Sequence, residues 1–175
     1  MGWREFARLG AYKFRDYYWT ANNLKASKSL TKEWYEGTTG IEPVDVTIHK
    51  AFDTGYLHHI ERLMIMGNYM TLYGMKPKDM YKWFMEFSMD SYDWVMIVNV
   101  FGMAAHSDAV KGPTFTKPYI SSSNYVLKMS HYKKKDSWTK KWDDSFYAFL
   151  RKHKDIWSKN PRMSLMMRLL EKNPQ

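Results

Sequence analysis

The stretch Tyr56-Leu-His-His-Ile-Glu-Arg-Leu-Met-Ile-Met-Gly-Asn-Tyr-Met70 predicts the helix around which we expect the chain to fold. Its apolar residues recur at near-helical spacing, at Ile60, Leu63, Met64, Met66 and Met70. His58 and Arg62 are one helical turn apart on the same face, and His59 lies beside them. Such groups on an apolar helix cost desolvation free energy unless an anionic or polar group contacts them.

A second apolar stretch, Ser88-Met-Asp-Ser-Tyr-Asp-Trp94, carries carboxylates that can meet this arginine. Asp90 and Asp93 are about one helical turn apart. We therefore expect Arg62 to contact one of the two aspartates beside a buried ligand. The plainer alternative is an interhelical salt bridge and a core histidine without any ligand, because structural ion pairs are common.

The length and composition indicate a globular protein. At 175 residues, the chain is long enough for one domain with a sizeable core, so we expect a single domain over residues 1–175. Aromatic residues make up 17% of the sequence, with 8 Trp and 13 Tyr. Side chains of this kind line a core around a flat ligand, stack on bases at a surface, or simply fill an aromatic-rich core, and composition does not separate these alternatives.

The charge favours an anionic partner such as nucleic acid, because the formal net charge is +9. Basic residues cluster at Lys133-Lys134-Lys135 and at Lys140-Lys141, although a charge run is commonly only a solvated face. The absence of cysteine excludes disulfides, thiolate nucleophiles and cysteine-ligated zinc or iron–sulfur clusters. Without a long apolar run or a signal-peptide pattern, the sequence predicts a soluble intracellular protein of the cytoplasm or nucleus, with no membrane partner.

The chain is predicted to be all-α, since no segment alternates with the period of a strand. Helices are expected from the first residues, from Pro43 to about Phe52 with a stop at Gly55, through 58–74, from Pro77, over 90–103, from Ser121–Asn124 to Met129, from an N-cap at Ser137 to Trp157, and from Pro161 to about Lys172. The polar stretch 22–40 is expected to be a loop, and 106–119 is too rich in Gly and Pro for one regular element. The abrupt helical start suggests a chain cut from something longer.

No common catalytic motif is present. The chain has no HExxH zinc motif, no Gly-rich phosphate loop and no nucleophile elbow, so we predict no metal site. A helical haem or metal protein using His58 or His59 lacks a second well-spaced ligand. Asp90 and Asp93 are able to act in acid–base chemistry, but on a helix such residues more often hold partner helices or caps.

Several stretches, in order along the chain, resemble one known family. They are Gly2-Trp-Arg-Glu-Phe6, Gly55-Tyr-Leu-His-His-Ile-Glu-Arg-Leu-Met64 with Gly67-Asn68, Asp90-Ser-Tyr-Asp-Trp-Val95, Asn99-Val-Phe-Gly-Met103, Lys117-Pro-Tyr119, Ser123-Asn-Tyr125, Lys128-Met-Ser130 and Asn160-Pro-Arg162. Together they are similar to the C-terminal, helical FAD-binding domain of the photolyase/cryptochrome superfamily. The closest resemblance is to the class of bacterial cryptochromes and (6-4) photolyases that carries an iron–sulfur cluster.

The resemblance implies FAD in a helical pocket, from which the reduced flavin passes an electron to a photolesion in damaged DNA. By position, the residues implied to lie around the flavin are Arg4, His59, Arg62, Phe84, Asp90, Tyr92 and Met96. Arg62 and Asp90 then form the ion pair beside the isoalloxazine ring, where an arginine stabilises negative charge on the flavin.

The resemblance also implies catalytic, electron-transfer and DNA-binding roles. Trp3 matches the aromatic residue that packs on the flipped lesion, and His59 matches the histidine that faces the lesion and donates a proton. Trp83 and Tyr125 match electron-transfer positions, while Phe84 replaces a tyrosine found in some relatives. The residues implied to contact DNA are Lys117, Tyr119, Lys133, Lys134 and Lys140.

Two departures from the family pattern bear on function. The positions of the cluster cysteines are occupied by Pro43 and by the segment 133–142, so no iron–sulfur cluster is expected. A full member also has an antenna-binding domain and phosphate-gripping helices before Gly2-Trp3. We therefore expect a partial domain of a photolyase or cryptochrome that repairs UV photolesions, with (6-4) photoproducts as the expected lesion. The alternatives are one half of a split photolyase, completed by a companion chain, or a non-catalytic DNA-binding or scaffold remnant that does not bind FAD alone.

Overall fold

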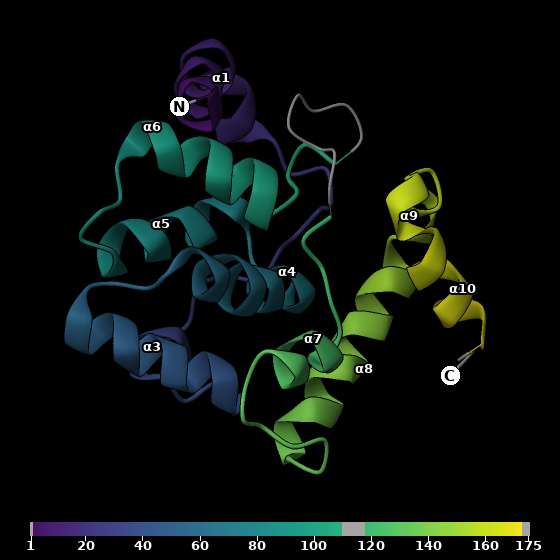
Figure 1. Cartoon of the computed structure of the whole chain (residues 1–175). Helices are drawn as coiled ribbons and strands as arrows, with labels where there is room; N and C mark the ends of the chain where they lie inside the picture. Colours follow the sequence, from purple (N-terminus) through teal and green to yellow (C-terminus); the bar gives the residue numbers. More distant parts are fainter. Residues whose placement is uncertain (1, 110–117, 173–175) are drawn as a thin grey trace.

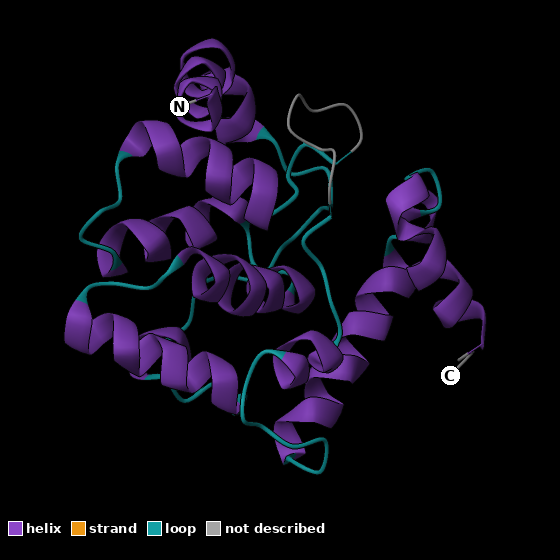
Figure 2. Cartoon of the chain, viewed as in Figure 1, coloured by secondary structure: helices purple, strands orange, loops and turns teal. Residues whose placement is uncertain are grey.

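A computed structural model describes residues 2–109 and 118–172, and over these ranges it contains helices and loops but no strand (Figure 1 and Figure 2). The helices in chain order are α1 (Gly2–Thr20), α2 (Glu33–Glu36), α3 (Glu42–Thr54), η1 (Glu61–Gly67), α4 (Asn68–Tyr73), α5 (Pro77–Phe87), α6 (Asp93–Met96), η2 (Ile97–Ala104), α7 (Ser123–Lys128), α8 (Ser137–Lys152), α9 (Lys154–Trp157), η3 (Pro161–Met163) and α10 (Ser164–Lys172). The predicted all-α class is confirmed.

The helix α1 lies across the continuous pair α6–η2 at one end of the molecule (Figure 1). Its buried face carries the small residues Ala7, Gly10 and Ala11, which allow a close approach to the neighbouring helix. A Cβ added at Gly10 would lie 3.3 Å from Val98 Cγ2. Small side chains on α1 therefore set the distance between α1 and η2.

Below α6–η2, the chain stacks α5, η1–α4 and α3 (Figure 1). Pro43 lies in the first turn of α3, where its missing N–H costs nothing, and Gly55 ends that helix with φ 62°. The predicted start and stop of α3 are thus confirmed. The helices α4 and α5 are separated by Gly74, which has φ 87°, and by Pro77 at the start of α5.

Two segments, η1 and η2, are π-helical and were not predicted. A π-helical turn contains one more residue than an α-helical turn, so the regular spacing of apolar residues in the sequence does not reveal it. Such turns are frequent at functional sites. The two segments contact each other at Gly67, where an added Cβ would lie only 2.8 Å from the Cβ of Ala104. The small residues Gly67 and Ala104 therefore allow these two irregular helices to pack closely.

The second part of the chain packs α8 on α4, with α7 and α10 against α8. Buried polar groups join the two parts: Trp142 Nε1 donates to Ser121 O at 3.0 Å, and Asn68 Nδ2 donates to Ser121 Oγ at 2.9 Å. The long late helix differs from its prediction in two ways. Its N-cap is Asp136 rather than Ser137, and it ends at Lys152, so that Trp157 lies on the separate α9.

The loop predicted over 22–40 contains one short helix, α2, which ends at Gly37 with φ 66°. This turn forms because Trp34 is buried in the main hydrophobic core, an effect of tertiary packing that the polar local sequence does not indicate. That core also contains Trp83, Trp138 and Trp142, each at most 1% exposed. Within the described ranges, no helix has the length and apolar composition needed to cross a bilayer.

Candidate functional site

A cavity of about 290 Å³ lies between the α3–η1 connection, η1, the end of α5 and the α6–η2 pair. Five of the residues predicted to surround a flavin line it: His59, Arg62, Phe84, Asp90 and Met96. The rest of the wall is formed by Tyr56, Leu57, Leu63, Val95, Asn99, Val100, Met103 and Ala104. The tertiary structure therefore brings together residues from three separate sequence stretches.

The guanidinium of Arg62 is fixed by contacts on several sides. Its Nη2 lies 2.7 Å from Asp90 Oδ1, and its Nε donates to Leu57 O at 2.6 Å. The ring of Tyr56 lies beneath it, with the ring centroid 5.5 Å from Cζ. The Arg62 side chain is 16% exposed and that of Asp90 is 52% exposed. The predicted contact between Arg62 and one of the two aspartates is confirmed.

Backbone contacts place Asp90 opposite this arginine. The amide of Met89 donates to Gly55 O at 2.9 Å, which joins the α5–α6 connection to the end of α3. Ser91 Oγ donates to Phe84 O at 3.0 Å and fixes the other side of Asp90. An added Cβ at Gly55 would lie 2.6 Å from Met89 Cγ, so glycine is required there for space as well as for its positive φ.

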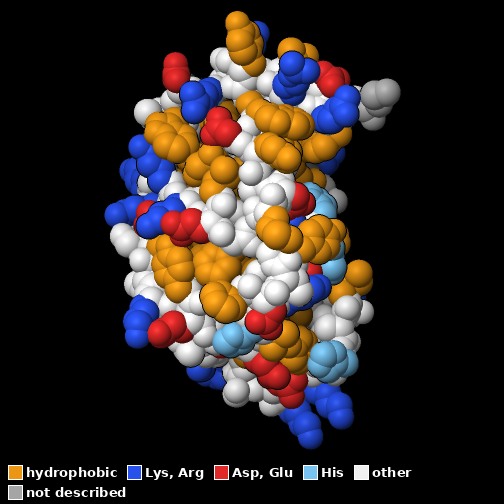
Figure 3. Space-filling view, turned by 90° about the vertical axis from the view of Figure 1, so that its left-hand side faces the viewer, with side chains coloured by type: hydrophobic (Ala, Val, Ile, Leu, Met, Phe, Trp, Pro, Cys, Tyr) orange, Lys and Arg blue, Asp and Glu red, His pale blue; other side chains and the backbone are white. Residues whose placement is uncertain are grey.

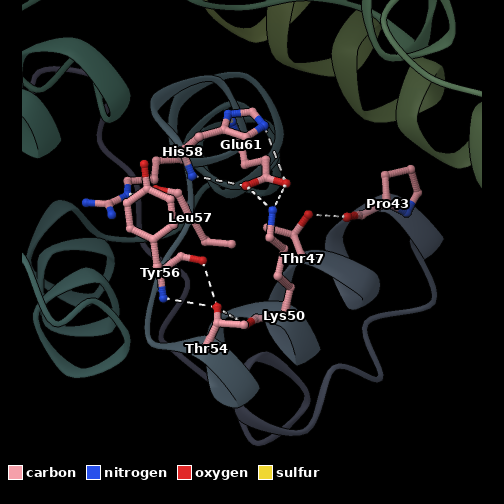
Figure 4. A network of polar contacts seen from close by, with 9 residues as sticks. Pro43, Thr47, Lys50, Thr54, Tyr56, Leu57, His58 and Glu61 are labelled. Atoms are coloured by element: carbon pink, nitrogen blue, oxygen red, sulfur yellow. Dashed lines mark hydrogen bonds and ion pairs between the residues drawn. The ribbon is translucent and has the colours of Figure 1, made fainter.

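A reciprocal capping arrangement begins the helical run that carries His59 and Arg62 (Figure 4). The amide of Glu61 donates to His58 Nδ1 at 3.2 Å, and the amide of His58 donates to Glu61 Oε2 at 3.0 Å. This is the geometry of a capping box, with a histidine in place of Ser or Thr. Lys50 Nζ donates to both carboxylate oxygens of Glu61, at 2.7 and 2.9 Å, and so ties the cap to α3.

The cap gives His58 a structural role and leaves His59 free to line the cavity. The described residues contain no group of three or more His, Asp or Glu side chains arranged to hold a metal ion.

The deep wall of the cavity is apolar apart from Asn99. Phe84, Met96, Val100 and Met103 are buried there, as a flat aromatic ligand requires. Asn99 Oδ1 is buried and accepts no hydrogen bond. An unpaired buried amide costs free energy, so this side chain is suited to pairing with a polar group of a ligand. Asn99 was not predicted as a site residue, although it is the single polar residue in the apolar segment 97–104.

Three of the residues predicted to contact the flavin or the lesion lie outside the cavity wall. Trp3 is 55% exposed on the first turn of α1 and stacks on Phe6 with a centroid distance of 5.2 Å. Arg4 is exposed and contacts Glu5 at 3.3 Å. Tyr92 is 65% exposed just before α6. Their roles toward a flavin or a lesion stay predictions.

The two predicted electron-transfer residues differ in their surroundings. Trp83 is fully buried and contacts Phe84 edge to face, with the ring centroids 5.2 Å apart. Its Nε1 donates to Trp34 O at 2.8 Å. Tyr125 lies half-buried on α7 and contacts no other aromatic ring in the described part of the chain. Geometry therefore connects Trp83, but not Tyr125, to the cavity wall.

The predicted DNA-binding lysines lie near the start of α8. Lys133, Lys134 and Lys140 are exposed, and Lys140 forms an ion pair with Asp144 at 3.6 Å. Tyr119 is half-buried, and its amide donates to His106 Nε2 at 3.4 Å. Lys117 falls outside the described residues.

Figure 3 shows the side of the molecule that is on the left in Figure 1, where the α3–η1 and α5–α6 connections lie. Hydrophobic side chains gather on this face between basic and acidic ones. Phe52, Tyr56, Met89 and Tyr92 in these connections and at their borders are all more than half exposed. The two connections that contribute Tyr56 and Asp90 to the cavity wall thus also expose aromatic side chains on this face.

Comparisons with known proteins agree with this geometry. A family model described as the FAD binding domain of DNA photolyase matches residues 1–163. A (6-4) photolyase from Agrobacterium fabrum is 36% identical over 132 residues, which cover 75% of this chain and 26% of that protein. An uncharacterized protein of Acanthamoeba polyphaga mimivirus is 56% identical over 87 residues, covering 50% of this chain and 69% of the relative. A second uncharacterized mimivirus protein is 38% identical over 53 residues, covering 30% and 40% of the two chains.

Proposed function

Because the chain belongs to the family of DNA photolyase FAD-binding domains, we propose that it holds the flavin ring in a light-dependent photolyase or cryptochrome that repairs UV photolesions. We propose (6-4) photoproducts as the lesion, in line with the (6-4) photolyase from A. fabrum. The observation that carries this proposal is the Arg62–Asp90 ion pair on the wall of an otherwise largely apolar cavity.

The residues of the cavity fit a flavin ring. A flat ring can pack against the buried side chains of Phe84, Met96 and Val100, while Arg62 provides positive charge beside it. The unpaired Asn99 Oδ1 offers a hydrogen-bond acceptor for a polar ring edge. A bound FAD would supply a light-absorbing centre for one-electron transfer, and this chain's residues would orient it and exclude water from one side.

The cavity is small for a whole dinucleotide. Its volume of about 290 Å³ is at the lower end of the roughly 300–1,000 Å³ typical of ligand pockets. The chain also spans only 26% of the (6-4) photolyase that it resembles. We therefore propose that residues beyond this sequence, on the same polypeptide or on a companion chain, complete the pocket around the FAD phosphates.

His59 and Trp3 are proposed to act on the lesion. His59 lines the cavity, in the first turn of the helical run that the cap at His58 begins. From there it can donate a proton to a lesion flipped toward the flavin. Trp3, exposed and stacked on Phe6, offers an aromatic surface for the flipped bases.

The exposed lysines near α8 are proposed to bind the phosphates of damaged DNA. Lys133, Lys134 and Lys140 add positive charge without burying it, as non-specific phosphate contacts require. Tyr119 and Lys117 are proposed to extend this contact.

The first experiment is an absorption spectrum of the purified chain after incubation with FAD and desalting. We expect the band of oxidised flavin to be retained, and retention to increase when the remaining part of the FAD-binding domain is added from a full-length relative. A repair assay on DNA containing one (6-4) photoproduct then tests the activity of the completed protein. No retained flavin under either condition would contradict the assignment.

The small cavity also favours a second candidate, a DNA-binding or scaffold domain of the same fold that does not bind FAD by itself. This candidate predicts salt-sensitive binding to duplex DNA by a colourless protein. Equal affinity for damaged and undamaged duplexes would support this candidate, whereas a preference for the lesion would support the photolyase.

A further inference from the structure

A second cavity, of about 210 Å³, lies where the ends of α4 and α8 approach each other (Figure 1). Its wall comes from the segment 24–28, the end of α4 with Met75, and the last turn of α8. The end of η2 contributes Ala104 to the wall of the first cavity, and the next residue, Ala105, lines the second. Of the described residues, none lines both cavities, so binding at each can be measured independently.

Most of the wall of the second cavity is apolar. Leu24, Leu72, Met75 and Phe149 line it, and each of these side chains is at most 7% exposed. A dry cavity of about 150 Å³ is large enough to hold benzene. The larger space here therefore has room for a single ring, or a branched aliphatic group of that size, together with a small polar group.

One buried polar side chain in this wall, His153, has hydrogen-bonding groups that the fold does not use. It is 9% exposed, and its ring packs on that of Phe149 with a centroid distance of 4.7 Å. Among the described residues, neither ring nitrogen of His153 has a hydrogen-bond partner. Burial, followed by the charge of Lys152, lowers the pKa of His153 to about 4, so at neutral pH the ring is uncharged and carries one N–H donor. A buried donor of this kind costs free energy unless a ligand accepts its hydrogen bond.

Two lysines give the second cavity a positive charge. Lys28 and Lys152 both line it, and neither forms an ion pair with a carboxylate in the described part of the chain. The ammonium of Lys28 lies 3.9 Å from the centroid of the Tyr73 ring, which belongs to the same wall. No Asp or Glu is found among the described residues of this wall. The charge therefore favours an anion and disfavours a cation.

The backbone of this wall favours a carboxylate over a phosphate. Phosphate sites commonly use several free backbone N–H groups or an arginine. Here the amides of Lys28, Gly74 and Met75 already donate to carbonyl groups of the chain at 3.0–3.1 Å. The described wall also contains no arginine. One neutral N–H donor with two exposed lysines nearby matches a singly charged group.

We propose that the second cavity binds a small monocarboxylate whose apolar body is about the size of one ring. The body packs against Met75 and Phe149, the ring N–H of His153 donates to a carboxylate oxygen, and Lys28 and Lys152 attract the negative charge. This binding activity is additional to the proposed flavin site and does not depend on it.

The test uses benzoate as the probe, with benzyl alcohol as its neutral counterpart and phenyl phosphate as its phosphate counterpart. Each is titrated into the purified chain and followed by two-dimensional NMR, in which the ring signals of His153 report on the site. We expect a benzoate Kd of about 1 mM or tighter, as a ligand of this size allows. Benzyl alcohol should bind at least about tenfold more weakly, because it carries no charge to match the lysines and the N–H donor. Phenyl phosphate should also bind more weakly than benzoate.

Two variants test the position of the site. His153→Leu removes the N–H donor and keeps an apolar side chain, so the benzoate Kd should rise about tenfold or more. Ala148 lines the cavity but is exposed on α8, where leucine is well tolerated. A148L places a larger side chain at the cavity and should abolish benzoate binding without loss of stability.

Two further variants test the role of charge. K28Q and K152Q should each raise the benzoate Kd by up to about fivefold, the range expected of exposed charges. The matched control is K154Q, which removes the same charge from an exposed position on α9 outside the cavity wall and should leave the Kd unchanged.

The outcomes decide the proposal without FAD. Circular dichroism and urea unfolding first establish that each variant is folded, and if H153L is unfolded, A148L decides whether this cavity is the site. The proposal is overturned if the wild type binds no benzoate at about 10 mM, if A148L binds it fully, or if benzyl alcohol binds as tightly. Equal or tighter binding of phenyl phosphate would overturn the carboxylate class. Because none of these measurements uses flavin, failure of the flavin site would leave this result unaffected.

Discussion

Arg62 Nη2 lies 2.7 Å from Asp90 Oδ1, although the two residues are 28 positions apart in the sequence and lie on different segments. The contact depends on three arrangements: the cap at His58, the Gly55–Met89 backbone bond and the π-helical packing of η1 on η2. Each can be tested separately from the chemistry of the cavity.

Replacing Arg62 or Asp90 by alanine should weaken FAD binding. Loss of a hydrogen bond to a charged group costs about 1.5–3 kcal/mol, which corresponds to roughly a tenfold to hundredfold change in Kd. The half-exposed Asp90 should give the smaller effect because solvent screens it. Fluorescence titration with FAD checks this on the chain or on its completed form. Unchanged affinity in both variants would exclude the pair from the flavin site.

Replacing Glu61 by alanine should destabilise the chain. Its carboxylate accepts from the His58 amide and from Lys50, and only 16% of its side chain is exposed. Loss of such a cap costs about 0.5–2 kcal/mol. Urea unfolding measures the change. The control is E36A, which removes an exposed ion pair with Lys32 and should cost at most about 0.5 kcal/mol.

Gly67→Ala should disturb the contact between η1 and η2. The new Cβ would lie 2.8 Å from Ala104 Cβ and 3.1 Å from Arg62 O, so the helices must separate. Overpacking of this kind costs about 1–3 kcal/mol. We expect a lower urea midpoint together with weaker FAD binding, because the shift moves the backbone of Arg62. Gly2→Ala, where nothing lies within 4 Å of the added Cβ, serves as the control and should not lower stability.

Acid should destabilise the fold through two buried histidines. Burial lowers the pKa of His106 from 6.5 to about 3, and burial followed by the charge of Lys152 lowers the pKa of His153 to about 4. Below about pH 6.5 the unfolded chain binds protons that the folded chain does not, so the free energy of unfolding falls as pH falls, by about 1.4 kcal/mol per pH unit for each histidine.

His106→Asn should roughly halve this dependence between about pH 6 and 4.5, because His153 remains. Asparagine is suited to the positive φ of 46° at position 106. Urea unfolding at a series of pH values gives the slope, and His131→Asn, at an exposed position, is the control. An unchanged slope in H106N would show that another group causes the acid sensitivity.

Alanine at Lys133, Lys134 and Lys140 should weaken DNA binding equally for damaged and undamaged duplexes. Each lost phosphate contact should reduce the slope of log K against log salt by about 0.9. Filter binding at several salt concentrations measures this slope. Removal of Lys25 and Lys32, which lie on other segments, should leave it unchanged. An unaltered slope in the triple variant would place the DNA elsewhere.

The sequence by itself determined the all-α class, because hydrophobic period, Pro43, Gly55, Gly74 and Pro77 are local signals that act within one or two turns. It also predicted that Arg62 contacts Asp90 or Asp93, since a charged group on an apolar helix requires a partner, and the structure shows that the partner is Asp90. The short helix α2 and the end of α8 before His153 were not predicted. Burial of Trp34 and Trp157 decides them rather than local propensity.

Only the tertiary structure decided the site in detail. The π-helical turns, the histidine cap and the unpaired Asn99 depend on how η1, η2 and α3 pack, and no periodic pattern records them. The second cavity is formed by the ends of α4 and α8, which are far apart in the sequence. Local sequence fixes where helices begin and end, because those interactions span a few residues. Which side chains meet is set by the packing of helices against one another, and that depends on the whole chain at once.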